Sequence, residues 1–432
     1  MNFLTKLFKF EENNTNFKTE LLAGLTTFFT MSYLIILSPK ILQTTGLDFN
    51  ATLTITAILV FIFSVLMGLY TNKPYAVAPF LGETAFIAYT VVGTLEFSIN
   101  TAFGAIFICG ILLLLMSLFN IREFILNQIP ETIKIAFCTG LGLFFMFIAL
   151  KDMELVNFTN NAIPLSMGNF TDIHVILGLF CFITLIVLTK KEVKGAILIA
   201  IALTTIIGLL IGDITLPERL ISIPTNISSS LLQVDFSNIL TKNFLPIFFV
   251  IFLLVNIDTS GALIGLSYKT ESNPKEIKLK KPMIVDSLSV IAAPLMGTTT
   301  PGAYFDSMTG IAAGGRTGLT AITVGILFLI GLIFAPIISI IPAYAYAPAL
   351  LYIGILIATI ITKLDFEDIT EYATAFVIIC TMIFTYNIGT GVVLGFIIYP
   401  LIKLLCGKQK QTNPTMWTLF ALSIIYFIVY PY

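Results

Sequence analysis

Long apolar runs separated by short polar connections recur along nearly the whole chain. Each run has about the length, roughly 20 residues, that a helix needs to cross a membrane, and none alternates like a barrel strand. The pattern therefore predicts an all-α polytopic membrane protein with fourteen spans. They lie near residues 21–42, 51–70, 74–95, 101–119, 132–150, 174–189, 194–212, 244–268, 283–296, 299–314, 317–341, 347–363, 371–387 and 389–406. A last apolar run, 417–432, either spans again or lies in the interface.

The composition supports this class. Hydrophobic residues make up 57% of the chain and charged residues only 11%, against about a quarter in soluble domains. No polar connection is long enough to form a soluble domain, and no basic patch suggests nucleic acid. The five cysteines fall in or at the end of apolar runs without metal-ligand spacing, so we expect no metal and no cofactor.

Lysines and arginines are concentrated in alternate connections, for example 190–194 and 269–281. Because cytoplasmic connections carry the excess of positive charge, this distribution predicts a cytoplasmic N-terminus. We expect a multi-pass protein of the cell membrane, the inner membrane where a cell has two.

Two segments resemble each other across the chain. SVLMGLYTNKPYAVAPF (64–80) joins the second predicted span to the third, and APLMGTTTPGAYFD (293–306) joins the ninth to the tenth. A repeat unit of seven spans is odd, so the second copy would be inverted in the membrane, as in many secondary transporters. The predicted division is a first repeat at 1–212, a second at 213–406 and a tail at 407–432.

Both segments are poor continuous helices. Pro74, Pro79 and Gly82 interrupt the third span, and TTTPG (298–302) interrupts the tenth. Each span should be extended in its first half and helical in its second. Because extended backbone at membrane depth must be buried in protein or line a cavity, we expect the two breaks to face each other across a cavity. The half-helix starts near Thr84 and Asp306 would favour acceptor or anionic groups.

Three acids lie within the spans beside or opposite these breaks: Glu83, Asp258 and Asp306. An ionised acid is costly at the centre of a membrane, and a buried one can hold a proton and release it when its surroundings open. The three therefore predict a proton-coupled substrate site. The alternative is that an acid caps a half-helix or pairs with a nearby hydroxyl. We favour that alternative for Asp286, which lies near the cytoplasmic end beside two lysines.

Aromatic residues adjoin both breaks: Phe80 in the third span, and Tyr304 and Phe305 in the tenth. Aromatic rings stack on flat, conjugated molecules. We therefore expect these three side chains to contact a flat ring.

Four stretches resemble the AzgA-like purine permeases of the nucleobase/ascorbate transporter (nucleobase:cation symporter 2) superfamily. They are TELLAGLTTFFTMSYLIILSP (19–39), NKPYAVAPFLGETAFIAY (72–89), NIDTSGALIGL (256–266) and GTTTPGAYFDSMTGIAAGGRTGLTA (297–321). The resemblance implies two inverted repeats of seven spans and a mobile core (spans 1–4 and 8–11) that moves against a gate (spans 5–7 and 12–14). It also implies a homodimer and uptake of hypoxanthine, guanine or adenine driven by protons, with Na+ as the other candidate ion.

Position by position, Asp258 matches the acid of the eighth span that binds the base or couples the proton. Asp306 matches the acid of the tenth span that hydrogen-bonds the base, with Tyr304 and Phe305 beside it. Two departures bear on the cargo. The family usually has GLNAYF where this chain has GETAFI, so Thr84 replaces an asparagine and Glu83 an apolar residue. Asp306 replaces a glutamate and is one methylene shorter.

The sequence thus predicts a secondary active transporter that imports a purine nucleobase with protons by elevator-type alternating access, with membrane lipid as its surroundings. Another cargo on the same fold, such as uracil, xanthine or a small anion, is the main alternative. Acids at the site, and the lack of an arginine or lysine beside the breaks, disfavour an anion. An intramembrane enzyme is disfavoured because no histidine or cysteine lies near the three acids, and a channel because pores repeat rings of residues between subunits.

Overall fold

A computed structural model gives the structure of most of the chain. The described residues are 2–122, 128–158, 165–193, 195–217, 219–221, 227–228, 230–237, 241, 244–270, 279–385 and 387–429. Three lysines used to predict the topology, Lys194, Lys275 and Lys278, lie outside them. The chain forms two compact units, each assembled from two separate stretches. The first unit is Met1–Leu126 with Pro217–Ser339, and the second is Asn127–Leu216 with Ile340–Tyr432.

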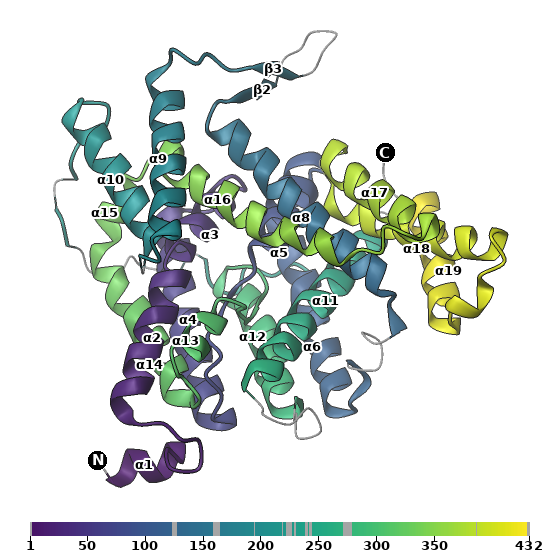
Figure 1. The fold of residues 1–432 in the computed structure, drawn as a ribbon, viewed down its shortest axis with the longest axis horizontal. Coiled ribbons are helices and arrows are strands. Elements are labelled where there is room, and N and C mark those ends of the chain that lie inside the picture. Colours follow the sequence, from purple (N-terminus) through teal and green to yellow (C-terminus); the bar gives the residue numbers. More distant parts are fainter. Residues whose placement is uncertain are drawn as a thin grey trace. The chain divides into compact units, whose positions relative to one another are not determined.

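The first unit is helical except for two short strands (Figure 1). Its elements are α1 (Asn2–Phe8), α2 (Phe17–Met31), α3 (Leu34–Gln43), α4 (Phe49–Thr71), β1 (Val77–Pro79), α5 (Leu81–Ala85), the π-helix η1 (Phe86–Thr94), α6 (Ile99–Leu118), α11 (Leu245–Thr270), α12 (Lys280–Met296), β4 (Pro301–Ala303), α13 (Ser307–Ala312), α14 (Gly318–Gly331), the 3-10 helix η3 (Leu332–Phe334) and α15 (Ala335–Ser339).

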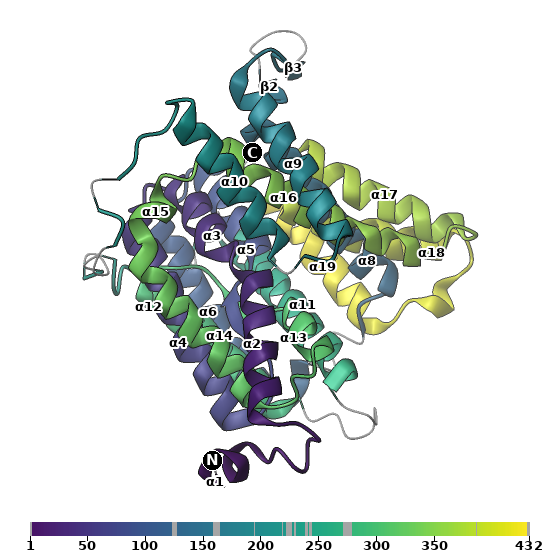
Figure 2. The same ribbon diagram turned by 60° about the vertical axis from the view of Figure 1, so that its left-hand side comes forward.

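The second unit is helical apart from a small hairpin. Its elements are α8 (Glu131–Asp152), β2 (Val156–Phe158), β3 (Leu165–Met167), α9 (Ile173–Lys190), α10 (Ala196–Leu210), α16 (Ala343–Ala358), the 3-10 helix η4 (Thr359–Lys363), α17 (Ile369–Phe384), α18 (Ile388–Leu405), the 3-10 helix η5 (Gln409–Gln411) and α19 (Pro414–Val429). Figure 2 shows α17 and α18 side by side.

Nine helical segments in the described parts of the chain are long and apolar enough to cross a membrane. Three shorter apolar helices, α10, α17 and most of α19, occupy further predicted spans or the last apolar run. The all-α polytopic class is therefore confirmed, and the count of fourteen crossings stays a prediction. The first predicted span differs in one respect, because it consists of two helices, α2 and α3, that meet at Ser32 and Tyr33.

The two predicted breaks are present and face each other. Strand β1 pairs antiparallel with β4, with Val77 opposite Ala303, Ala78 opposite Gly302 and Pro79 opposite Pro301. Each strand leads into a short helix, α5 or α13. Pairing gives backbone groups of each broken span hydrogen-bond partners in the other, which is what membrane depth demands of non-helical backbone. The expectation of extended first halves and helical second halves is confirmed.

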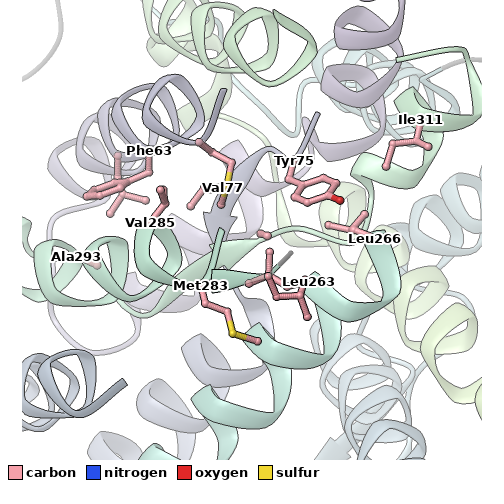
Figure 3. Packing of buried hydrophobic residues seen from close by; sticks show 13 residues of the cluster. Phe63, Tyr75, Val77, Leu263, Leu266, Met283, Val285, Ala293 and Ile311 are labelled. Carbon is pink, nitrogen blue, oxygen red and sulfur yellow. The ribbon is translucent and has the colours of Figure 1, made fainter. Parts of the chain in front are cut away.

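A buried apolar cluster surrounds the paired strands (Figure 3). Val77 and Ala303 contribute from the strands, and Leu263 and Met283 contribute from α11 and α12. In Figure 3 Val77, Leu263 and Met283 lie close to the strands, with Phe63 of α4 on one side and Ile311 of α13 on the other. Because well-packed interiors resist deformation, the cluster holds the strand pair at a defined place within the first unit.

Close helix packing also fixes the turn after the tenth predicted span. A Cβ on Gly318 would lie 1.9 Å from the carbonyl oxygen of Gly68, so α14 and α4 touch through backbone, and both views show the two helices side by side (Figures 1 and 2). The buried carboxylate of Glu20 on α2 accepts hydrogen bonds from the amides of Arg316 (2.9 Å) and Thr317 (3.2 Å). The glycine-rich segment 314–318 is thus a tight turn and not a phosphate loop.

Glycines play the same part in the second unit. A Cβ on Gly142 of α8 would lie 2.5 Å from the carbonyl oxygen of Gly354 on α16, and one on Gly140 would lie 2.5 Å from Sδ of Met382 on α17. The glycines of GLGLFF (140–145) therefore let α8 approach both helices closely, as small residues do in membrane helix packing.

Candidate functional site

The strand pair of the first unit brings two predicted aromatic residues together. The amide of Phe80 donates to the carbonyl oxygen of Thr300 (3.0 Å), and the amide of Tyr304 donates to that of Ala76 (2.8 Å). These bonds continue the pairing of β1 and β4 at both ends. The rings of Phe80 and Tyr304 then stack with centroids 5.6 Å apart and planes 25° from parallel. Two rings from opposite halves of the chain thus form one aromatic surface.

Gly302 is required for this arrangement. A Cβ at that position would lie 2.3 Å from Cε2 of Phe80 and 2.7 Å from Oδ1 of Asp286. Neither distance is compatible with a side chain, so only glycine lets the Phe80 ring and the Asp286 carboxylate approach β4 together.

Thr84, which stands where the resembling family has asparagine, is fully buried on α5. Its hydroxyl donates to the carbonyl oxygen of Phe80 (2.7 Å) and lies 2.7 Å from the hydroxyl of Thr299. Since the Thr84 proton is used in the first bond, Thr299 donates in the second. Thr84 therefore links the two broken spans, in addition to any contact with a ligand.

Glu83 is only 2% exposed, and neither of its carboxylate oxygens has a hydrogen-bond partner within the described part of the chain. The side chain interacts electrostatically with the carboxylates of Asp258 on α11 and Asp286 on α12. Burying a charged group without partners is costly. The position therefore suits either a proton shared with Asp258 or N–H donors of a ligand.

Asp306 lies at the position before α13 without capping it. Its carboxylate accepts a hydrogen bond from the hydroxyl of Tyr33 (3.3 Å), which also lies 3.5 Å from the hydroxyl of Tyr304. The break between α2 and α3 places Tyr33 there. Sequence reasoning did not single out Tyr33, because the first span holds several other polar residues and no local signal separates this tyrosine from them.

Phe305 is placed differently from its two aromatic neighbours. Its side chain is 55% exposed, and its ring lies beside Gly265 of α11, where an added Cβ would be 2.8 Å from Cε2. It is thus not part of the stacked pair. Its contact with a ligand stays a prediction.

The structure corrects one argument drawn from the sequence. A basic residue does adjoin the breaks, because the fully buried Arg122, which follows α6, pairs with Asp286 at 2.9 Å. Asp286 therefore does not belong with the lysines at the cytoplasmic end. Its other oxygen accepts from the amide of Ala303 in β4 (3.2 Å). Arg122 was missed because it lies in a polar connection of the sequence, more than a hundred residues from its partner.

Within the described residues, one group of side chains in the second unit could hold a metal ion. Glu154, Asp172 and His174 each offer one ligand atom, and these atoms lie within 4.8 Å of one another. The other ring nitrogen of His174 lies 3.1 Å from Asp213, which also accepts from the hydroxyl of Tyr344 (2.7 Å). These hydrogen bonds hold the pKa of Asp213 below its usual value.

Sequence comparisons point to one family. The profile of the Permease family (Xan_ur_permease) matches residues 18–394. The adenine permease AdeQ of Escherichia coli is 37% identical over 98% of this chain and 96% of its own. The guanine/hypoxanthine permease PbuO of Bacillus subtilis is 32% identical over 98% of this chain and 99% of its own.

A solved structure shares the fold at low sequence identity. The transmembrane domain of the bicarbonate transporter BicA from a cyanobacterium superposes with a TM-score of 0.67 over 88% of this chain and 97% of its own, at 18% identity. This likeness concerns the fold alone.

Proposed function

Because the chain belongs to the Permease family, we propose that it is a secondary active transporter that imports a purine nucleobase together with protons. The observation that carries the proposal is a stacked aromatic surface, Phe80 and Tyr304, in the same unit as the buried carboxylate of Glu83, for which the described residues offer no hydrogen-bond partner. A purine offers a flat ring and polar edge atoms, which match these two features. The relatives named for adenine and for guanine and hypoxanthine support the same class of cargo.

The acids supply the proposed coupling. A purine would contact the aromatic surface and hydrogen-bond to Asp306 and Glu83, while Asp258 with Glu83 holds the proton. Neutralising a buried acid lowers the cost of carrying it through the membrane, so a loaded and protonated site moves more readily than an empty, charged one.

The remaining parts of the proposal rest on the pattern of apolar runs and charges and on the family resemblance. They are fourteen crossings in two inverted repeats, a cytoplasmic N-terminus, a homodimer, and elevator-type movement of spans 1–4 and 8–11 against the other six. Protons drive uptake, and Na+ is the alternative ion.

Uptake into liposomes tests the proposal. The purified protein is reconstituted, and uptake of radiolabelled adenine, hypoxanthine, guanine, xanthine and uracil is measured with and without an inward proton gradient, and again with an inward Na+ gradient. We expect saturable uptake of at least one of adenine, hypoxanthine and guanine, stimulated by the proton gradient. Asp306→Asn should reduce it at least tenfold.

Thr418→Val is a suitable control, because among the described residues this exposed hydroxyl bonds only within its own helix, to the carbonyl oxygen of Pro414 (3.1 Å). Its uptake should equal that of the unmodified protein. Uptake of only uracil or xanthine would change the proposed cargo from adenine, hypoxanthine or guanine to that base and leave the proposed mechanism unchanged. Absence of uptake for all five bases would reject a nucleobase as cargo.

A further inference from the structure

Arg122 makes more contacts than any role in helix packing requires. Its guanidinium is fully buried and uses all three nitrogens. Nε donates to the hydroxyl of Ser260 (3.0 Å), and Nη2 donates to the hydroxyl of Thr259 and to the carboxylate of Asp286. Nη1 has three oxygen acceptors, in Ser117, Met283 and Ser287. The side chain thus joins the end of α6 to both α11 and α12.

The first connection runs from Arg122 through Asp286 to the paired strands β1 and β4. Asp286 binds Arg122 through one oxygen and the amide of Ala303 in β4 through the other. Ala303 directly precedes Tyr304, whose ring stacks on Phe80. A carboxylate that holds a backbone amide does so best when ionised, and a cation beside it offsets much of the cost of burying that charge.

The second connection leads to the proposed coupling acid. Thr259 and Ser260 follow Asp258 directly on α11, and Arg122 binds both hydroxyls. The Thr259 hydroxyl also donates to the carbonyl oxygen of Val255 (2.6 Å), so it accepts from Arg122 without losing its own bond. Arg122 thereby fixes the helical turn that carries Asp258.

Acidic side chains outnumber basic ones around Arg122 in the described part of the chain. The titratable groups that face one another are Glu83 on α5, Asp258 on α11, Asp286 on α12 and Tyr304 directly after β4. Glu83 interacts with both other acids, and Tyr304 interacts with Glu83 and Asp258. Arg122 is the cation paired with them in the described residues. With Arg122 and Asp286 as a neutral pair, the remaining two acids are the ones that can exchange protons.

We propose that Arg122 is a positioning residue that neutralises Asp286, so that Asp286 holds β4 while the Glu83–Asp258 pair carries the exchangeable proton. This inference rests on the proposed function for its transport readout. Removal of either charge of the Arg122–Asp286 pair would then change the pH range of uptake, and the two changes would have opposite signs.

The test compares initial uptake rates against pH for the unmodified protein, Arg122→Gln, Arg122→Lys and Asp286→Asn. Gln leaves the Asp286 charge unopposed, so the neighbouring acids keep their proton to higher pH and the alkaline limb of the profile should move up by about one pH unit. Asn leaves the Arg122 charge unopposed and keeps an oxygen for the Ala303 amide, so the limb should move down by a similar amount. Lys keeps the charge and should keep the profile, with a lower maximal rate because it cannot donate as a fork.

Arg219→Gln is the matched control, since this arginine is exposed in the same unit. Unmoved profiles in both Arg122→Gln and Asp286→Asn, with rates reduced alike, would show a merely structural ion pair and overturn the proposal. If Arg122→Gln does not fold, Asp286→Asn decides alone, and an unmoved profile in it overturns the proposal.

A second readout needs no transport. The melting temperature of the solubilised protein is recorded against pH for the same variants, and opposite displacements of its pH dependence in Arg122→Gln and Asp286→Asn are expected. If the pH dependence of the melting temperature is displaced but no base is taken up, the proposed cargo is rejected and the role of Arg122 stands. If a base is taken up but the pH dependence of the melting temperature is not displaced, the cargo stands and the role of Arg122 is rejected.

Discussion

The hydroxyls of Thr84 and Thr299 lie 2.7 Å apart and connect two spans that are more than two hundred residues apart in the sequence. Thr84 donates to the carbonyl oxygen of Phe80 and accepts from Thr299. The bond lies next to the aromatic surface and joins the first helical turn after β1 to the residues before β4. The bond therefore contributes directly to the stability of the contact between the two broken spans.

Replacing Thr84 with valine keeps the shape of the side chain and removes the hydroxyl. The buried Thr299 hydroxyl then loses its acceptor, which costs about 1–3 kcal/mol of unfolding free energy. We expect a lower melting temperature and reduced purine uptake. Thr418→Val should change neither, and equal melting temperatures for the two variants would show that the bond adds nothing to stability.

Gly302→Ala tests the close approach at β4. The added methyl group would collide with Phe80 and Asp286, and forced overpacking of this kind typically costs about 1–3 kcal/mol. We expect uptake to fall at least tenfold, because the ring stack cannot keep its geometry. Gly261→Ala on α11 is the control, since a Cβ there meets no atom within 4 Å. Normal uptake by Gly302→Ala would mean that the stack is not needed.

The buried Lys403 and the partly buried Glu371 form an ion pair in the second unit. The Lys403 ammonium is fully buried and lies 2.5 Å from Glu371, with further acceptors in Thr370 and Gln411 (2.7 Å each). Lys403→Met leaves the carboxylate without its cation and should cost about 3–5 kcal/mol of unfolding free energy. The double variant Lys403→Met with Glu371→Leu should recover part of that loss. The check is chemical or thermal unfolding of the unmodified protein, Lys403→Met, Glu371→Leu and the double variant. A loss in the double variant that equals or exceeds the loss in Lys403→Met would contradict the role of the pair.

Asp368 gives a prediction of pH dependence. Lys408, at 2.5 Å, and the hydroxyl and amide of Thr370 hold the pKa of Asp368 well below its usual value near 4. A lowered folded-state pKa stabilises the protein above the unfolded-state value, and this stabilisation is lost as the pH falls toward the folded-state value. The melting temperature of Asp368→Asn should thus lie below that of the unmodified protein at pH 7. The gap should narrow below pH ~4, and a gap independent of pH would exclude an electrostatic cause.

Local signals predicted the two breaks and their strands. Pro74, Pro79 and Pro301 disfavour continuous helix wherever the rest of the chain folds, so both segments could be recognised from the sequence. The demand that membrane-buried backbone be satisfied led only to the expectation that the two breaks face each other across a cavity, and their direct antiparallel pairing was not predicted.

Arg122, Tyr33 and the π-helix η1 could not be predicted in this way. Arg122 pairs with Asp286, which lies on another helix. Tyr33 bonds to Asp306 from the junction between α2 and α3, where the first span is interrupted. The π-helix carries no distinct apolar period, so nothing in the sequence separates it from an ordinary helix. The contacts of Arg122 and Tyr33 are tertiary, and a single sequence does not record which distant residues meet.

The pairing of β1 with β4 also has a consequence for biosynthesis. The ribosome completes β1 at Pro79 and reaches β4 only at Pro301. At common rates of synthesis, about 5–20 residues per second, roughly 10–45 seconds separate the two. During that interval the backbone of β1 lacks its partner strand while the first spans already enter the membrane. The backbone groups of β1 must therefore bond temporarily to other partners, such as water, lipid head groups or the insertion machinery. These partners are displaced when β4 has been synthesised and pairs with β1.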